Sequence, residues 1–166
     1  MNATKRNKTP GYGFTLIELI IVITIIGILA AVALPRLVNI QRDARIAKAQ
    51  AIYGVLRSAS VLAKVRCELD LSMGVIGQCT STGGQVDMEG TNVVMVNRYP
   101  AASLVGIDTA AQLTNPTNDG LIVSGTSPRV YQISGASIPA TCQVAYTEST
   151  GPGNAPNIVP PVVTGC

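Results

Sequence analysis

An uninterrupted apolar run, residues 14–34, occupies the N-terminal part of this sequence. It has 21 residues, one ionisable side chain (Glu18) and two other polar side chains (Thr15 and Thr24). At 1.5 Å per residue a helix of this length would measure about 31 Å, close to the ~30 Å hydrocarbon core of a bilayer. The run is therefore long and apolar enough to cross a membrane.

A cleaved secretory signal is the main alternative for this run. Basic residues precede it, and the small residues Ala31 to Ala33 would suit a signal peptidase that releases a product beginning at Leu34. However, the run exceeds the ~7–15 apolar residues usual for such signals, and Glu18 lies inside it. Basic residues lie on both sides, so the positive-inside count leaves the orientation open.

Charge is unevenly distributed along the chain. Residues 36–66 hold seven Lys or Arg and one Asp, a net charge of +6, whereas residues 67–166 hold two Arg and seven acids, a net charge of −5. This asymmetry indicates either solvated faces or complementary contacts between copies of the chain. Nucleic-acid binding is not expected, because no basic patch is rich in aromatic residues.

Residue types needed for common catalytic sites are missing. The chain has no His and no Trp, which excludes Ser-His-Asp and Cys-His catalysis and any His-ligated metal. The oxygen-rich stretch "NPTNDG" (115–120) lacks the spaced acids of an EF-hand loop and is interpreted as a turn. We therefore expect no enzyme activity, no catalytic residue, no cofactor and no metal.

Four cysteines follow the apolar run: Cys67, Cys79, Cys142 and Cys166. None has Cys-x-x-Cys spacing, and an even number favours two disulfides, which need an oxidising compartment. The C-terminal part is therefore expected outside the cytoplasm. Three connectivities are possible, and the local pairs Cys67–Cys79 and Cys142–Cys166 are favoured because each closes one loop.

Glu18 needs an explanation of its own. A carboxylate at the centre of a spanning helix costs on the order of 3 kcal/mol, and less near an end. It is either tolerated close to the interface or retained for a function, with a partner of opposite charge.

The leader ending in Gly13, followed by "FTLIELIIVITIIGILAAVALP", resembles the N-terminus of type IV prepilins and of the related type II secretion pseudopilins. Gly13, Phe14, Glu18 and Pro35 stand where that pattern has them. The resemblance implies cleavage between Gly13 and Phe14 by a prepilin peptidase and N-methylation of Phe14. It also implies that Glu18 pairs with the Phe14 amine of a neighbouring copy in a helical homopolymer.

For the fold, the resemblance implies the α+β type IV pilin fold. We expect a cleaved basic leader (1–13), a hydrophobic transmembrane or filament-core helix (14–35), the amphipathic half of that helix (36–69) and a β-rich head (70–166). A helix from residue 14 to about 69 would be about 84 Å long, too long for one small head to cover, so half should protrude. Gly27 and Pro35 weaken the helix, and the resemblance implies that this stretch can unwind in a filament.

Beyond Pro35, apolar residues recur in steps of three and four, which predicts a helical stripe. Its members are Leu37, Ile40, Ala44, Ala47, Ala51, Val55, Ala59 and Leu62.

The head sequence predicts short strands, a helix and a bounded loop. Residues 91–97, 120–125, 129–134 and 142–147 are predicted as strands of one antiparallel sheet laid against the helix, with turns at "NDG" and "TSP". Residues 106–113 are predicted as a short helix capped by Asp108. The loop between Cys142 and Cys166 resembles the disulfide-bounded C-terminal region of pilins.

A narrower resemblance, carried by "EGTNVVMVNRYPAA", "CQVAYTE" and a terminal "GC", is to the mannose-sensitive haemagglutinin (MSHA) class of type IV pilins. Arg98 stands where Gly is expected in that class. The function implied is a pilin stored in the inner membrane of a Gram-negative bacterium, polymerised by the pilus assembly machinery into an extracellular adhesive filament. The alternatives are a type II secretion pseudopilin and a membrane-anchored binding module that does not polymerise.

Overall fold

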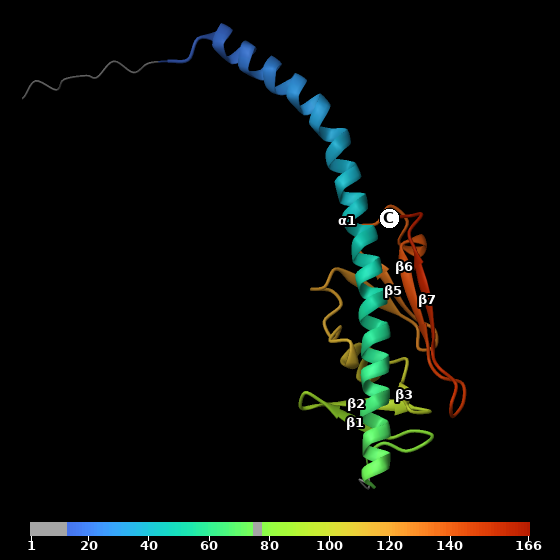
Figure 1. Ribbon diagram of the computed structural model, residues 1–166. Coiled ribbons are helices and arrows are strands. Elements are labelled where there is room, and N and C mark those ends of the chain that lie inside the picture. The colour runs from blue at the N-terminus through green and yellow to red at the C-terminus, as the bar shows by residue number, and fades with distance from the viewer. Residues whose placement is uncertain (1–12, 75–77) are drawn as a thin grey trace, which may run out of the picture. The chain divides into compact units, whose positions relative to one another are not determined.

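The computed structural model describes residues 13–74 and 78–166, so the predicted leader lies almost wholly outside the described residues. The architecture is α+β, with one long N-terminal helix followed by antiparallel strands (Figure 1). The chain divides into two units, the first ending at Ile40 and the second beginning at Gln41. Each unit is described by itself below.

Helix α1 (Leu16–Met73) has 58 residues and ends close to its predicted limit. It continues without interruption through Gly27 and Pro35, so their proposed role as weak points in an assembled filament stays a prediction. Gly74 ends the helix in a left-handed conformation (φ 65°), and its amide donates to the carbonyl of Leu71. Glycine takes this conformation without the strain that a Cβ would introduce.

Strands β4 (Leu121–Ser124), β5 (Arg129–Ile133), β6 (Gln143–Thr147) and β7 (Asn157–Val162) form a four-stranded antiparallel sheet in that order. Three of them match predicted strands. The Pro-rich β7 was not predicted, because Pro160 and Pro161 argue against a central strand. At the edge of the sheet they are tolerated through an irregularity in the β6–β7 pairing.

A second antiparallel sheet consists of β1 (Gln85–Met88), β2 (Thr91–Val96) and β3 (Tyr99–Pro100). The prediction of one sheet was therefore wrong, because residues 91–97 pair with these neighbours and not with β4–β7. Two-residue turns at Glu89–Gly90 and Asn97–Arg98 join the strands, and all four turn residues have positive φ. Such turns favour local hairpins over distant partners.

Two hydrophobic clusters attach these sheets to the α1 residues of the second unit. Ile52 and Leu56 pack with the four-stranded sheet, whereas Ala63 and Cys67 pack with β1 and β2. Figure 1 shows the β1–β3 sheet beside the last turns of α1 and β5–β7 beside earlier turns.

The predicted stripe was wrong in phase. Of its members in the second unit only Ala59 is buried, and the buried side of α1 consists of Ala49, Ile52, Leu56, Ala59, Ser60, Ala63, Cys67 and Asp70. Alanines that recur regularly along the exposed side produced a second apolar periodicity.

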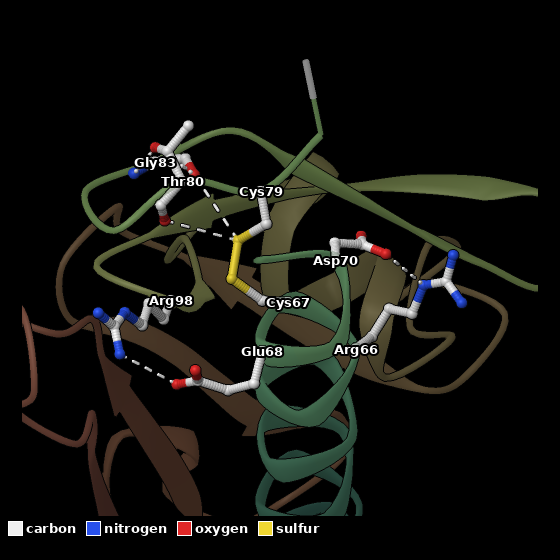
Figure 2. Close-up of a disulfide and its surroundings, with 8 residues drawn as sticks. All are labelled: Arg66, Cys67, Glu68, Asp70, Cys79, Thr80, Gly83 and Arg98. Atoms are coloured by element: carbon white, nitrogen blue, oxygen red, sulfur yellow. Dashed lines mark hydrogen bonds and ion pairs between the residues drawn. A yellow bond between two sulfur atoms is a disulfide. The ribbon is translucent and has the colours of Figure 1, made fainter. Parts of the chain in front are cut away.

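Disulfides join Cys67 to Cys79 and Cys142 to Cys166, the two local pairs that the sequence favoured. Figure 2 shows the first, which ties α1 to the segment before β1, with ion pairs on either side of it. Arg66 Nε lies 3.4 Å from the buried Asp70, and Arg98 Nη1 lies 3.2 Å from Glu68.

Arg98 does stand at a position that favours glycine, with φ 71°. A non-glycine residue there costs about 1 kcal/mol. The ion pair with Glu68 and a hydrogen bond from Asn97 Nδ2 to the carbonyl of Ser149, at 2.9 Å, anchor this turn on both sides.

The prediction for residues 106–113 was wrong in its detail. Residues 104–110 form irregular helical turns: η1 (Leu104–Asp108) is interrupted by the non-helical Gly106 (φ −106°, ψ −107°), residues 109–110 follow it, and Asp108 caps neither. Its carboxylate is buried and binds Arg129 and Tyr131 of β5 instead. Asp108 therefore binds residues distant in sequence instead of capping a neighbouring helix.

Candidate assembly site

The first turn of α1 is built by Thr15 and Glu18. The amide of Glu18 donates to Thr15 Oγ1 at 3.2 Å, and Thr15 Oγ1 donates to Glu18 Oε2 at 3.5 Å. This is the arrangement of a threonine N-cap with a glutamate at the third helical position. The sequence analysis missed this role of Glu18, although the Thr-x-x-Glu spacing before an apolar run would have revealed it.

Phe14 precedes this cap and is 86% exposed. Every residue from 14 to 40 is exposed, including all the aliphatic side chains of the apolar run. Among the described residues, α1 is the one helix long and apolar enough to cross a membrane, by length and composition. Such a surface has to be covered, because exposed apolar area of this extent is unfavourable in water.

Thr24, the other polar residue of the run, is satisfied within the helix. Its Oγ1 donates to the carbonyl of Ile21 at 2.8 Å. Hydroxyl groups bonded in this way are compatible with an apolar environment. Glu18 is therefore the one side chain of residues 16–34 whose charge needs a partner from elsewhere.

Of the large aliphatic residues of α1 in the second unit, four are exposed by 48% or more. Val61, Leu62, Val65 and Leu69 are 58%, 60%, 50% and 48% exposed. We call them the open face of α1. A shallow hollow of about 560 Å³ beside it is lined by Lys64, Glu68 and Tyr99 together with three of these residues.

Several basic residues after the apolar run are bound within the second unit. Arg45 Nη1 donates to the carbonyl of Cys166 at 3.1 Å, and Lys48 donates to the carbonyls of Asp119 and Gly120. The ammonium of Lys64 lies 5.2 Å from the ring centroid of Tyr99. Some of the basic side chains of residues 36–66 therefore make their contacts within the same copy of the chain. The backbone of the "NPTNDG" turn is one of the groups they bind, through Lys48.

Asp108, Arg129 and Tyr131 form a buried charge cluster in the head. Arg129 Nε lies 2.9 Å from both carboxylate oxygens of Asp108, and the Tyr131 hydroxyl donates to Oδ1 at 2.5 Å. The hydrogen bond to Asp108 raises the pKa of Arg129. Burial, reinforced by Asp108, raises the pKa of Tyr131 well above its usual value, and burial also raises the pKa of Tyr146. Asp108, Arg129 and Tyr131 hold η1 against β5, and we assign them a structural role.

A model of the prokaryotic N-terminal methylation motif matches residues 12–34. This range contains Gly13, Phe14 and Glu18. The chain carries a prokaryotic N-terminal methylation motif. The motif covers the whole apolar run and the carboxylate within it.

A curated protein is similar to part of the chain. The chain is 50% identical over 56 residues to the type IV narrow pilus major component PilA5 of Thermus thermophilus. The match covers 34% of this chain and 48% of that protein, so the chain spans about half the length of the curated relative. No solved structure showed significant similarity.

The curated relative is described as a pilus component, and neither matched description is that of an enzyme. The narrower resemblance to MSHA pilins stays a prediction.

Proposed function

We propose that this chain is the structural subunit of a type IV pilus. The observation that carries the proposal is the match of residues 12–34 to the methylation motif. The exposed apolar run, residues 14–34, supports it, since it offers both a membrane anchor before assembly and a helix that copies can bury together afterwards. The pilus component to which residues of this chain are 50% identical supports it further.

Processing explains the position of Glu18. Cleavage after Gly13 by a membrane prepilin peptidase creates a positive amine on Phe14, which is then methylated but stays charged. An amine and a carboxylate that both enter an apolar core lose hydration, and pairing across two copies offsets that cost. Each copy carries one of each group near the start of α1, so the pairing repeats from copy to copy along a filament.

The parts of the chain receive the following roles. Residues 1–13 are the leader, 14–35 the membrane and filament-core segment, 36–69 the following part of the helix, and 70–166 the head. The precursor is held in the inner membrane, and the filament is extracellular and mediates surface attachment. A type II secretion pseudopilin would share the processing and would form a short periplasmic filament instead.

Analysis of sheared surface material tests the proposal. Filaments are removed from cells that produce the chain, viewed by electron microscopy, and their subunit mass is measured. We expect long filaments whose subunit begins at N-methylated Phe14. A product beginning at Leu34 would establish an ordinary secretory signal and overturn the proposal, and processed chain found only in the cell envelope would favour the pseudopilin.

A further inference from the structure

A hollow lies on α1 near the end of the apolar run. Its volume is about 380 Å³, and it is lined by Ala30, Ala33, Leu34, Arg36, Leu37 and Ile40. All six residues belong to the first unit and are exposed. The two alanines leave room beside the larger aliphatic side chains, so an apolar group can lie against the helix here, next to the side chain of Arg36.

Arg36 has no partner of opposite charge among the described residues, whose ion pairs use other arginines. On the surface of the helix, the residues three and four positions from Arg36 are Val32, Ala33, Asn39 and Ile40. None of them is acidic, so the positive charge is available to an anion from outside the chain.

The length of the apolar run sets the level of Arg36 in a bilayer. A helix over residues 14–34 measures about 31 Å and matches the ~30 Å hydrocarbon core. Arg36 is two residues, or about 3 Å, beyond Leu34, and each headgroup layer is about 5–7 Å thick. In the membrane-bound chain Arg36 therefore lies at the level of the lipid headgroups, and Ala30 and Ala33 lie beside acyl chains.

Removal of the leader reverses the balance of basic residues around the run. Cleavage takes away Lys5, Arg6 and Lys8, whereas Arg36 and Arg42 remain on the side of the head. The disulfides of the head indicate an oxidising compartment on that side, outside the cytoplasm. Membrane helices usually keep their basic residues on the cytoplasmic side, so basic residues on the opposite side call for a partner there.

The chemistry of the hollow favours a phospholipid with a negative headgroup. A guanidinium binds two phosphate oxygens at once through charge-assisted hydrogen bonds, and basic residues at a membrane surface attract anionic lipids. The apolar lining gives an acyl chain of the same molecule a place beside the helix. A second copy is a poorer occupant, because its residues 14–40 hold one acid, Glu18, which the proposed filament pairs with the Phe14 amine.

We propose that the hollow around Ala30, Ala33 and Arg36 binds one anionic phospholipid of the non-cytoplasmic leaflet, with the phosphate on Arg36 and an acyl chain along the two alanines. The inference rests on the proposed function, in which a membrane holds the chain before assembly. Its consequence is that a subunit entering the filament exchanges this lipid for the helices of other copies.

Two substitutions in the full chain test the two parts of the site. Arg36→Gln removes the charge, and Arg57→Gln is its control, because Arg57 is an exposed arginine of α1 in the second unit and gives the same change in net charge. Ala33→Leu fills the hollow without changing any charge. Ala31→Leu is its control, because Ala31 is also exposed but does not line the hollow.

Native mass spectrometry of the purified full chain in detergent measures binding, with phosphatidylglycerol and phosphatidylcholine added in equal amounts. We expect the parent, R57Q and A31L to carry phosphatidylglycerol in preference to phosphatidylcholine. The ratio of the two bound lipids should fall by about threefold or more in R36Q and in A33L. The basic residues of the leader are the same in every variant and do not affect the comparison. Glycerol 3-phosphate, which has no acyl chain, should not displace the lipid at the same concentration.

Each contrary outcome overturns the inference. Equal lipid ratios in the parent and R36Q would remove the role of Arg36, and a fall in R57Q as large as in R36Q would indicate general attraction to charge. A33L that binds like A31L would show that the hollow takes no part, and displacement by glycerol 3-phosphate would indicate a simple anion site. None of these measurements needs filaments, so each leaves the proposed function intact, whereas sheared material without filaments would overturn that function and not the lipid ratios.

Discussion

At the scale of single residues, Glu18 combines a local role with a proposed intermolecular one. Its carboxylate completes the cap of α1 with Thr15, and the proposed filament uses the same carboxylate to bind the Phe14 amine of another copy. The two roles can be separated, because glutamine preserves the capping pattern while removing the charge.

We expect Glu18→Gln and Glu18→Ala both to be processed after Gly13 and both to yield at least about tenfold fewer sheared filaments, since a buried amine without its partner costs about 3–5 kcal/mol. Thr15→Ala, which loses about 1 kcal/mol of capping, should still assemble. Immunoblots of sheared and cell-bound fractions measure this. Normal filament yield from E18Q would show that capping, and not charge, is what assembly needs.

Asp108 makes the head sensitive to one substitution. Asp108→Ala leaves the partly buried guanidinium of Arg129 without its carboxylate, so we expect the free energy of unfolding to fall by about 3–5 kcal/mol. The exposed Asp119→Ala should change it by less than about 0.5 kcal/mol. Urea denaturation of the full chain in detergent, followed by circular dichroism, compares the two variants. Equal stability of D108A and the parent would refute the structural role of the cluster.

At the scale of elements, β5 and β6 each bury a tyrosine whose pKa is raised mainly by burial. The folded chain therefore retains phenolic protons that the unfolded chain releases above pH ~10. Stability is full below that pH and falls as pH rises, by up to about 1.4 kcal/mol per pH unit for each tyrosine.

Melting temperatures between pH 9 and 11.5 measure this effect. The parent should lose stability more steeply than Tyr146→Phe, which keeps the ring and removes the ionisable group. Parallel pH profiles of the two proteins would contradict the assignment.

Strand β7 depends on the Cys142–Cys166 disulfide. It is a proline-containing edge strand, and the bond closes the loop that contains it, with a sequence separation of 24. The double variant Cys142→Ser/Cys166→Ser should lose roughly 3 kcal/mol of unfolding free energy in the chain-entropy model.

Hydrogen exchange should show faster exchange of the residue 157–162 amides in this variant, while the β1–β2 amides stay protected. The corresponding Cys67→Ser/Cys79→Ser variant should show the reverse order. Uniform loss of protection in both variants would indicate that the head unfolds as one unit.

At the scale of the whole molecule, the open face of α1 exposes apolar area to water, which is unfavourable unless assembly covers it. Leu62→Gln should leave the stability of the head within about 0.5 kcal/mol, because Leu62 is 60% exposed. Filament yield should nevertheless fall, since in the proposed filament this face is buried by other copies. Ile138→Gln, at a site 58% exposed and off α1, is the control for a lost apolar side chain. Equal yields from both variants would show that the open face stays uncovered in the filament.

Periodicity and spacing predicted much of the molecule. The long helix, the strands near residues 91–97, 120–125, 129–134 and 142–147, and the local cysteine pairs are each set by residues near in sequence. The residues of the candidate assembly site, Gly13, Phe14 and Glu18, lie within six positions, and the resemblance of this segment to prepilins pointed to them. The capping role of Glu18 was equally local and was missed only because its charge drew the interpretation toward a partner.

The remaining features depend on contacts between distant residues. The division into two sheets follows from which hairpins form. The buried side of α1 follows from where those sheets lie. The sequence of α1 has two apolar periodicities, and it could not show which of them would face the sheets. Asp108 became a buried ion-pair partner because Arg129 and Tyr131 come from a strand 21 and 23 residues away. The sequence by itself determined the apolar helix, the methylation motif that covers its start and the charge inside it. Only the tertiary structure decided which faces of α1 and of β4–β7 remain open, because burial belongs to the packed chain and not to any one segment.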